Sequence, residues 1–398
     1  YCDLLKNMVD TLFRINLYLL FCISFLPQHI FLPSITTTAD YFGSNYSTMQ
    51  FAISAFMAGG AFLQIIIGPL SDRFGRRPIL LICLVFFILT TVGCIISSEV
   101  YSFLICRTLQ AISISGLVIG RAIVADTHEQ KQVLQTMANL AVIMAGITIA
   151  GPILGELLDS NYGWKSSFYL LLFMGAILLL VNTTFLQETN SRKINNFWDQ
   201  IAQYGLLIRV KLFWGYVLSG NFATASFFSL LVATPYIIQK IFYLDSSWIG
   251  AMIGIIVLGF ILGNIISVKF SKYLSEFSWL LSGYTSLLFS ILLSLLLHNL
   301  LPNVLPALFA PFFFIGIGNG FIWPISIAGA ISINQNLRGS ASGLHGASMY
   351  FFGAVFSSVT GIMISIAENT WPLFLLLSTS SLIGIFVLFT LYAQNKKN

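Results

Sequence analysis

The stretch GPLSDRFGRRPILL, from Gly68 to Leu81, places one Asp and three Arg within six residues. On both sides of it the chain is almost free of charge for twenty residues or more. A run of about 20 apolar residues is the length that crosses the hydrocarbon core of a bilayer as a helix. A charged loop between two such runs predicts a turn between two membrane-spanning helices, held at the cytoplasmic face by its arginines.

The composition of the whole chain agrees with this interpretation. Of 398 residues, 57% are hydrophobic and only 8% are charged, and the mean hydropathy is +0.88. Soluble domains carry about 25% charged residues. A soluble protein of this size could not cover its surface with so few charged side chains. The net charge of +5 comes from Lys and Arg scattered between apolar runs, which does not match a nucleic-acid-binding surface. The sequence therefore predicts a multi-pass membrane protein.

Apolar runs long enough to cross a bilayer recur along the chain. We count twelve of them, which predicts an all-α integral membrane protein with twelve transmembrane helices. The expected spans are residues 13–36, 48–70, 78–97, 101–124, 133–158, 165–186, 211–238, 246–268, 277–297, 304–330, 340–366 and 370–392.

The basic residues set the expected orientation. If the N-terminus is cytoplasmic, sixteen of the nineteen Lys and Arg fall on the inner side, two fall on the outer side, and Arg107 lies within a span. Cytoplasmic loops are enriched in Lys and Arg, so we expect both termini in the cytoplasm and a location in the inner (cytoplasmic) membrane of the cell. The first apolar segment is too long for the core of a signal peptide and is interpreted as a retained first helix.

The longest polar interval, residues 187–210, falls between the sixth and seventh spans. It predicts a cytoplasmic linker between two six-helix halves, residues 1–186 and 211–398. The halves resemble each other at an offset of about 200 residues, since Leu32-Pro33 corresponds to Thr234-Pro235 and a glycine-rich helix follows each pair. Duplicated six-helix halves are a transporter architecture with the substrate site at their interface.

The charged loop resembles the motif G-x-x-x-D-R-x-G-R-R of the major facilitator superfamily. The matching residues are Gly68, Asp72, Arg73, Gly75, Arg76 and Arg77. The resemblance implies two pseudo-symmetric six-helix halves and a loop that acts as a latch on the cytoplasmic face, where it stabilises the outward-open state. Arg121 and Asp126, at the inner end of the fourth span, are assigned to the same latch network.

The fourth and fifth spans carry further motifs of the superfamily. In RTLQAISISG, Arg107, Gln110 and Gly116 resemble a buried R-x-x-Q-G motif, with Ala111 at the usual Gly. The stretch AGITIAGPILGELL resembles the G-P-x-x-G segment of antiporters, through Gly146, Gly151, Pro152 and Gly155, with Glu156 in place of the last Gly. This second resemblance implies close packing of helix five against the opposite half, which would seal the cavity against a proton leak.

The segments RAIVADT and ATPYIIQ are similar to the Bcr/CflA drug-resistance branch of the superfamily. That resemblance implies a secondary transporter that exports small organic compounds or drugs in exchange for protons, by alternating access. The partners it implies are a small-molecule substrate, protons and the lipid bilayer, and it implies a monomer. A transporter of one specific metabolite on the same fold, acting as an importer, is the alternative.

Arg107 is the most informative single residue of the fourth span. It lies about two turns inside the apolar run, where an unpaired charge is costly. We interpret it as a cavity residue, and the resemblance to the superfamily implies a role in coupling protons to substrate, together with Gln110. A side chain that snorkels to the outer interface is the alternative.

A proton-coupled transporter needs a titratable group within its spans. Members of the Bcr/CflA branch carry an Asp just before a Y-L-P segment in helix one, and His29 stands at this place in QHIFLP. Because His titrates near neutral pH, His29 is either the proton carrier or a hydrogen-bonding wall residue. Glu156, near the outer end of the fifth span, and His345, in the eleventh, are further candidates.

The sequence lacks the motifs of other function classes. The Cys and His residues show no metal-ligand spacing, and the sequence contains no nucleophile motif and no G-x-x-x-x-G-K-[ST] loop. We therefore predict neither an enzyme nor an ATP-driven pump, and no catalytic, metal-binding or cofactor-binding residues.

Overall fold

The computed structural model describes residues 2–127, 130–190, 204–270, 273–333 and 338–395. The first half contains α1 (Cys2–Ile30), α2 (Ile35–Tyr41), α3 (Tyr46–Phe74), α4 (Arg76–Ile96), α5 (Val100–Leu109), η1 (Gln110–Ile114), α6 (Ser115–Thr127), α7 (Gln130–Tyr162) and α8 (Lys165–Phe185). The second half contains α10 (Lys211–Tyr236), η2 (Ile237–Ile241), α11 (Ser247–Lys269), α12 (Glu276–Leu300), α13 (Leu305–Phe309), η3 (Ala310–Phe312), α14 (Phe313–Ser332), α15 (Arg338–Ala367) and α16 (Trp371–Asn395).

The predicted all-α fold with twelve membrane spans is confirmed. Within the described ranges, eleven helical segments are long and apolar enough to cross a membrane, and the bent pair Ile15–Ile30 with Ile35–Tyr41 adds a twelfth. The division of the chain at residues 187–210 stays a prediction, because residues 191–203 of that interval lie outside the described part.

Helix breaks recur at corresponding places in the two halves. The first span bends by 63° between Ile30 and Ile35, around Leu32-Pro33, because proline lacks a backbone N–H and disfavours the helical conformation of the residue before it. In the seventh span Pro235 lies just before the π-helical η2. The fourth and tenth spans each contain a short 3-10 segment, η1 and η3. The repeat that the sequence shows at proline and glycine therefore extends to the geometry of the helices.

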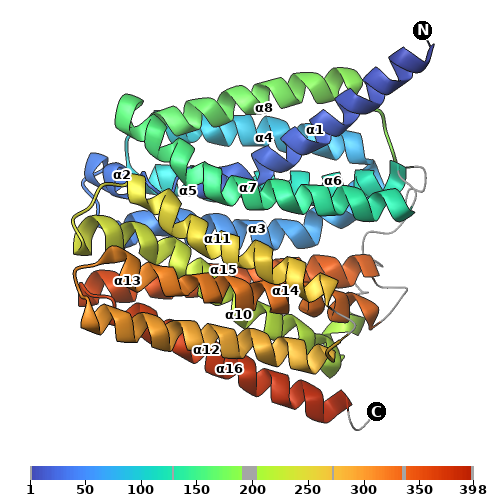
Figure 1. Cartoon of the computed structure of the whole chain (residues 1–398). Helices are drawn as coiled ribbons and strands as arrows, with labels where there is room; N and C mark the ends of the chain where they lie inside the picture. The colour runs from blue at the N-terminus through green and yellow to red at the C-terminus, as the bar shows by residue number, and fades with distance from the viewer. Residues whose placement is uncertain (1, 128–129, 191–203, 271–272, 334–337, 396–398) are drawn as a thin grey trace.

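The two halves lie side by side with their helices roughly parallel (Figure 1). α4 and α8 lie at the far side of the first half, and α12 and α16 lie at the far side of the second. α1 begins and α16 ends at the same end of the bundle, at the right of the figure, which also holds the α3–α4 loop. We call this end the basic end and the other, which holds α2 and α13, the opposite end.

Two helix pairs join the halves. Along α3 and α15, Gln64 packs against Gly346, Met57 packs against Gly353, and Gln50 donates a hydrogen bond to the Ser357 carbonyl. In the second pair, the isoleucine side chains of α7 pack against the glycine-bearing face of α11. The glycines let the helices of opposite halves approach closely.

Candidate functional site

The α3–α4 loop at the basic end is organised around Arg76. Gly75 separates the two helices with a φ of +106°, a conformation that favours glycine. The Arg76 guanidinium forms ion pairs with Asp72 and, at 3.2 Å, with Asp126, and it donates to Ser71 Oγ at 2.6 Å. The structure thus brings together three of the residues that the sequence assigns to the latch.

Two residues that sequence reasoning missed, Glu188 and Asn190, complete this cluster. The Glu188 carboxylate accepts hydrogen bonds from the backbone N–H groups of Arg76 and Arg77, at 2.9 and 3.2 Å, and thereby caps the first turn of α4. Asn190 Nδ2 donates to the Asp72 carbonyl at 2.7 Å. An acid soon after span six was the available signal, but the sequence gives no indication that it meets a loop 112 residues earlier.

The environment of Glu188 favours its ionised form. Partial burial raises the pKa of this carboxyl, but four hydrogen bonds from backbone N–H groups outweigh that effect and hold the pKa below its ordinary value. A negative charge at this place also complements the N-terminal end of the α4 dipole.

The remaining predicted latch residues lie around the cluster. The Arg77 guanidinium donates to the Thr183 carbonyl at 2.7 Å, the Arg73 guanidinium lies over the Phe74 ring, and Gly68 faces Val118 of α6.

Arg121 does not join this cluster. Its side chain is half-buried and interacts electrostatically with Tyr350 and His345 of α15, in the other half. No hydrogen bond or ion pair links Arg121 to the loop among the described residues, so its assignment to the latch network stays a prediction.

Arg107 lies inside the first half, with an exposed fraction of 0%. Its guanidinium donates to Gln110 Oε1 and to the Pro27 carbonyl, each at 2.5 Å, and lies over the rings of Phe31 and Phe56 at 5.0 and 4.8 Å. Gln110 in turn donates to Thr91 Oγ1 at 2.8 Å. The charge is stabilised by hydrogen bonds and aromatic faces, and no ion pair joins it to a carboxylate among the described residues.

This environment differs from both sequence-based interpretations of Arg107. The side chain neither faces an open cavity nor reaches the membrane interface, but ties span four to the carbonyl of Pro27 in span one. The first span bends by 63° directly after Ile30, so carbonyls in the last turn of α1 are available to donors from other spans. The sequence could not identify this acceptor, since any carbonyl near a helix break is eligible.

His29 lies two residues after Pro27, at the contact between α1 and α7. Its side chain is 1% exposed, its ring lies 4.9 Å from that of Phe25, and neither ring nitrogen has a hydrogen-bond partner among the described residues. In this conformation His29 is therefore not a hydrogen-bonding wall residue.

Helix five packs against the opposite half, but its motif glycines do not make that contact. A Cβ atom at Gly151 would lie 2.8 Å from His29 Cβ, and one at Gly155 would lie 2.0 Å from the Ile30 carbonyl oxygen, so both glycines face α1 of the same half. Pro152 lies beside them within α7, and Gly146 has no atom within 4 Å of a Cβ position. The contact with the opposite half is made by Ile149 and Ile153, which meet Gly254 and Gly250 of α11.

Polar side chains connect the halves at the opposite end. Thr36 of α2 donates to Gln239 Oε1 at 2.5 Å, and Gln239 donates to Ser246 Oγ at 2.7 Å. Glu156 of α7 lies near Ser246, Asp159 and Asp245. Glu156 therefore belongs to an inter-half network at the end of the bundle and not to the Arg107 environment.

His345 lies in the second half, away from His29. Its Nε2 atom is 3.1 Å from Ser326 Oγ of α14, and Ser326 donates to the Tyr216 carbonyl at 2.7 Å. These residues join α15, α14 and α10 in the half of the membrane toward the basic end.

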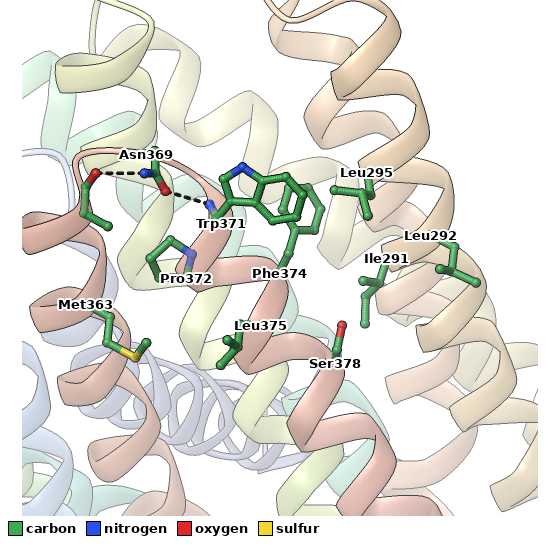
Figure 2. A pocket seen from close by; sticks show the side chains of 11 residues that line it. Ile291, Leu292, Leu295, Met363, Asn369, Trp371, Pro372, Phe374, Leu375 and Ser378 are labelled. Atoms are coloured by element: carbon green, nitrogen blue, oxygen red, sulfur yellow. Dashed lines mark hydrogen bonds between the residues drawn. The ribbon is translucent and has the colours of Figure 1, made fainter.

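A separate apolar hollow of about 510 Å³ lies near the opposite end of the second half (Figure 2). Leu292 and Leu295 of α12 form one wall, and Met363, Phe374 and Leu375 of α15 and α16 form the other. Asn369 lies at its rim, where it accepts a hydrogen bond from the Trp371 backbone N–H at 3.1 Å. A hollow lined in this way lacks the polar groups that orient a charged substrate.

The sequence profile of the Major Facilitator Superfamily matches residues 17–358. The chain belongs to the Major Facilitator Superfamily. It is therefore a multi-pass membrane transporter, and its duplicated fold is the fold of this superfamily.

Its relatives include transporters of bacteria. The uncharacterized MFS-type transporter YdgK of Bacillus subtilis (strain 168) is 27% identical over 339 residues, 84% of each chain. MdfA of Edwardsiella piscicida, a multidrug transporter, is 26% identical over 230 residues, 57% of this chain and 56% of MdfA. This chain thus matches about half the length of MdfA.

Solved structures share the fold at low identity. A bacterial homologue of the human lysosomal transporter Spinster superposes with a TM-score of 0.73 and 13% identity over 97% of each chain. A D-xylose–proton symporter superposes with a TM-score of 0.74 and 13% identity over 95% of this chain and 97% of the symporter.

Proposed function

We propose that this transporter exports small organic compounds, drugs among them, in exchange for protons, with its basic end in the cytoplasm of a bacterial cell. The excess of Lys and Arg at the basic end supports the orientation. The multidrug activity named for the MdfA relatives and the G-P-x-x-G segment in α7 support export by antiport.

The observation that carries the coupling proposal is the environment of His29. An imidazole without hydrogen bonds, packed between α1 and α7, is stable there only in its neutral form. A proton on His29 would therefore favour a conformation in which the α1–α7 contact opens and the ring meets water. Arg107, bound to the Pro27 carbonyl, would transmit this movement of α1 to span four.

The rest of the assigned residues have supporting roles in this proposal. The cluster of Asp72, Arg76 and Asp126, with Glu188, acts as the latch whose closure depends on the relative position of spans two, three and four. Substrate binding and proton release are linked, so each changes the affinity for the other by the same factor. A monomer contains every residue that the proposal uses.

The test is dye export from an efflux-deficient bacterial host. Cells that express the protein are loaded with a set of fluorescent dyes, and we expect faster export than in vector-only cells, abolished by an uncoupler that collapses the proton gradient. His29→Ala should reduce the dependence of export on the gradient at matched membrane abundance. Uptake of one metabolite without any dye export would support the importer alternative instead.

A further inference from the structure

The two halves meet along a seam between α3 and α15, which contact each other along their length (Figure 1). Glycines of α15 leave notches in this seam, and a Cβ atom built at each of them would overlap a side chain of α3. The α3 side chains follow each other at heptad spacing, which keeps one face of a helix against its partner. From the opposite end to the basic end, the pairs are Gln50 with Gly361, Met57 with Gly353 and Gln64 with Gly346.

Gln50 forms the layer of the seam nearest the opposite end. Its side chain is 1% exposed, and its Nε2 atom donates a hydrogen bond to the Ser357 carbonyl of α15. A backbone carbonyl has two lone pairs, so it can accept from a side chain as well as from its own helix. The amide fits there because residue 361, one turn later, is glycine. The donor in one half and the notch in the other are therefore a matched pair.

Tyr46, one turn before Gln50, makes a second hydrogen bond of the same kind. Its hydroxyl donates to the Val232 carbonyl of α10 at 3.0 Å, and its ring meets the Tyr236 ring with centroids 4.9 Å apart. Both donors lie in the first turns of α3, and both acceptors are backbone carbonyls of the second half. The start of α3 is thus attached to α10 and α15 together.

The next layer of the seam is built differently. Met57 is fully buried and apolar, and its flexible side chain can shift within the Gly353 notch without breaking a hydrogen bond. Separation of the halves at the opposite end, by contrast, would break the hydrogen bonds of Gln50 and Tyr46. Because a buried polar group that loses its partner is costly, these two bonds resist opening at this end.

We propose that Gln50, seated in the Gly361 notch, and Tyr46 form a clasp that keeps the opposite end of the transporter closed, and that the strength of this clasp sets how often that end opens. The inference rests on the proposed alternating access, but not on the direction of transport or on the residue that carries the proton. It gives the opposite end a conformational control separate from the loop cluster around Arg76.

The test is hydrogen–deuterium exchange of the purified protein, followed by mass spectrometry, because amide exchange reports local opening. Gln50→Leu removes the donor and keeps a side chain of similar size. We expect exchange to rise about three- to tenfold in the first turns of α3 and the last turns of α15, which corresponds to the loss of one buried hydrogen bond. Because the two ends open in alternation, exchange in the α3–α4 loop at the basic end should fall.

Gly361→Ala tests the clasp from the other half. It keeps Gln50 but fills the notch, so it should produce the same pattern, and it carries the test if Gln50→Leu fails to reach the membrane. Tyr46→Phe removes one hydroxyl and keeps the ring, and we expect a rise of about two- to threefold at the opposite end. Gln64→Leu is the matched control, since the same residue type on the same face of α3 lies two heptads closer to the basic end. It should not raise exchange at the opposite end.

Three outcomes would overturn the proposal. A rise at both ends in Gln50→Leu and Gly361→Ala would assign the two residues to general stability. Unchanged exchange in both variants would show that the bond does not hold the end closed. An equal rise at the opposite end in Gln64→Leu would assign the effect to any polar residue of the seam. None of these results depends on dye export, so a failure of the clasp and a failure of the proposed function are observed separately.

Discussion

Span four and span ten occupy equivalent places in the two halves, yet different interactions hold them. Span four contains the buried Arg107, whose charge is met by Gln110, the Pro27 carbonyl and aromatic rings. Span ten packs through glycine, since a Cβ atom at Gly316 would lie 2.0 Å from the Ile256 carbonyl oxygen of α11. One span is thus fixed by a charge in the bundle and the other by direct contact between helix backbones.

The same difference appears at the starts of spans three and nine. The first turn of α4 is capped by Glu188, a residue that lies beyond the sixth span. The first turn of α12 is capped locally, because Ser275 Oγ accepts from the Ser278 backbone N–H at 3.1 Å. The cap of α4 depends on a distant charged partner, and the cap of α12 depends on a short-range neutral one.

The comparison indicates which half of the transporter contains the groups that can respond to protons or to a change in charge. A capping carboxylate can respond to protons, and a hydrogen-bonded guanidinium can respond to movement of its remote partners. Backbone contacts at glycine have no charge to titrate and tolerate little separation. We therefore expect coupling to reside in the first half, with the second half moving as a more rigid body.

The largest expected effect is the loss of transport in Arg107→Ala. The change leaves the Gln110 and Pro27 acceptors without their donor, and we expect transport to fall about 100-fold or more. Asn319→Leu, at a buried polar position of span ten, is the matched variant, and it should lower transport by less than about tenfold. Dye export at equal membrane abundance measures both, and equal losses would break the proposed difference between the halves.

The second prediction concerns Gly316→Val in span ten. The added side chain would meet backbone atoms of α11, which cannot rotate away, so we expect a destabilisation of about 3 kcal/mol or more. Gly146→Val in α7 is the control, because nothing lies within 4 Å of its Cβ position. The measurement is thermal unfolding of the purified proteins in detergent, and similar midpoints for the two variants would contradict the account of span ten.

A smaller effect is expected for Gly151→Ala in the first half. Its Cβ atom would lie 2.8 Å from the His29 Cβ atom, which moves only with the backbone of α1, and this overlap is smaller than the one at Gly316, so we expect a destabilisation of about 1–2 kcal/mol. Because the contact is with α1, the pH dependence of dye export should change as well. An unaltered pH profile together with unaltered stability would remove the α1–α7 contact from the coupling proposal.

The smallest expected effect is in the helix caps. Glu188→Ala should destabilise the protein by about 1 kcal/mol or less, as should Ser275→Ala in the second half. The two caps differ in their pH dependence. The lowered pKa of Glu188 means that its contribution is present above the ordinary carboxyl value near 4.5 and is lost as the pH falls through the folded-state value.

The loss of stability caused by Glu188→Ala should therefore become smaller in acid. The loss of stability caused by Ser275→Ala should not change with pH. Thermal unfolding at neutral pH and at successively lower pH values checks this. A Glu188→Ala difference that persists unchanged in acid would show that the carboxylate charge does not contribute to the cap.

The sequence by itself determined the twelve spans and the place of the charged loop. A bilayer demands about 20 apolar residues per helix, so local hydropathy marks each span without knowledge of its neighbours. The motif around Asp72 and Gly75 also identified the superfamily, because its charges and glycines are close together in the chain.

Only the tertiary structure decided which residues meet. The acceptor of Arg107 lies 80 residues away, and Glu188 lies 112 residues from the helix that it caps. Gly151 faces α1, and the sequence could not assign this face. The physical reason is that a helix in a membrane is apolar on every side, so the hydrophobic pattern that reveals the buried face of a soluble helix is absent.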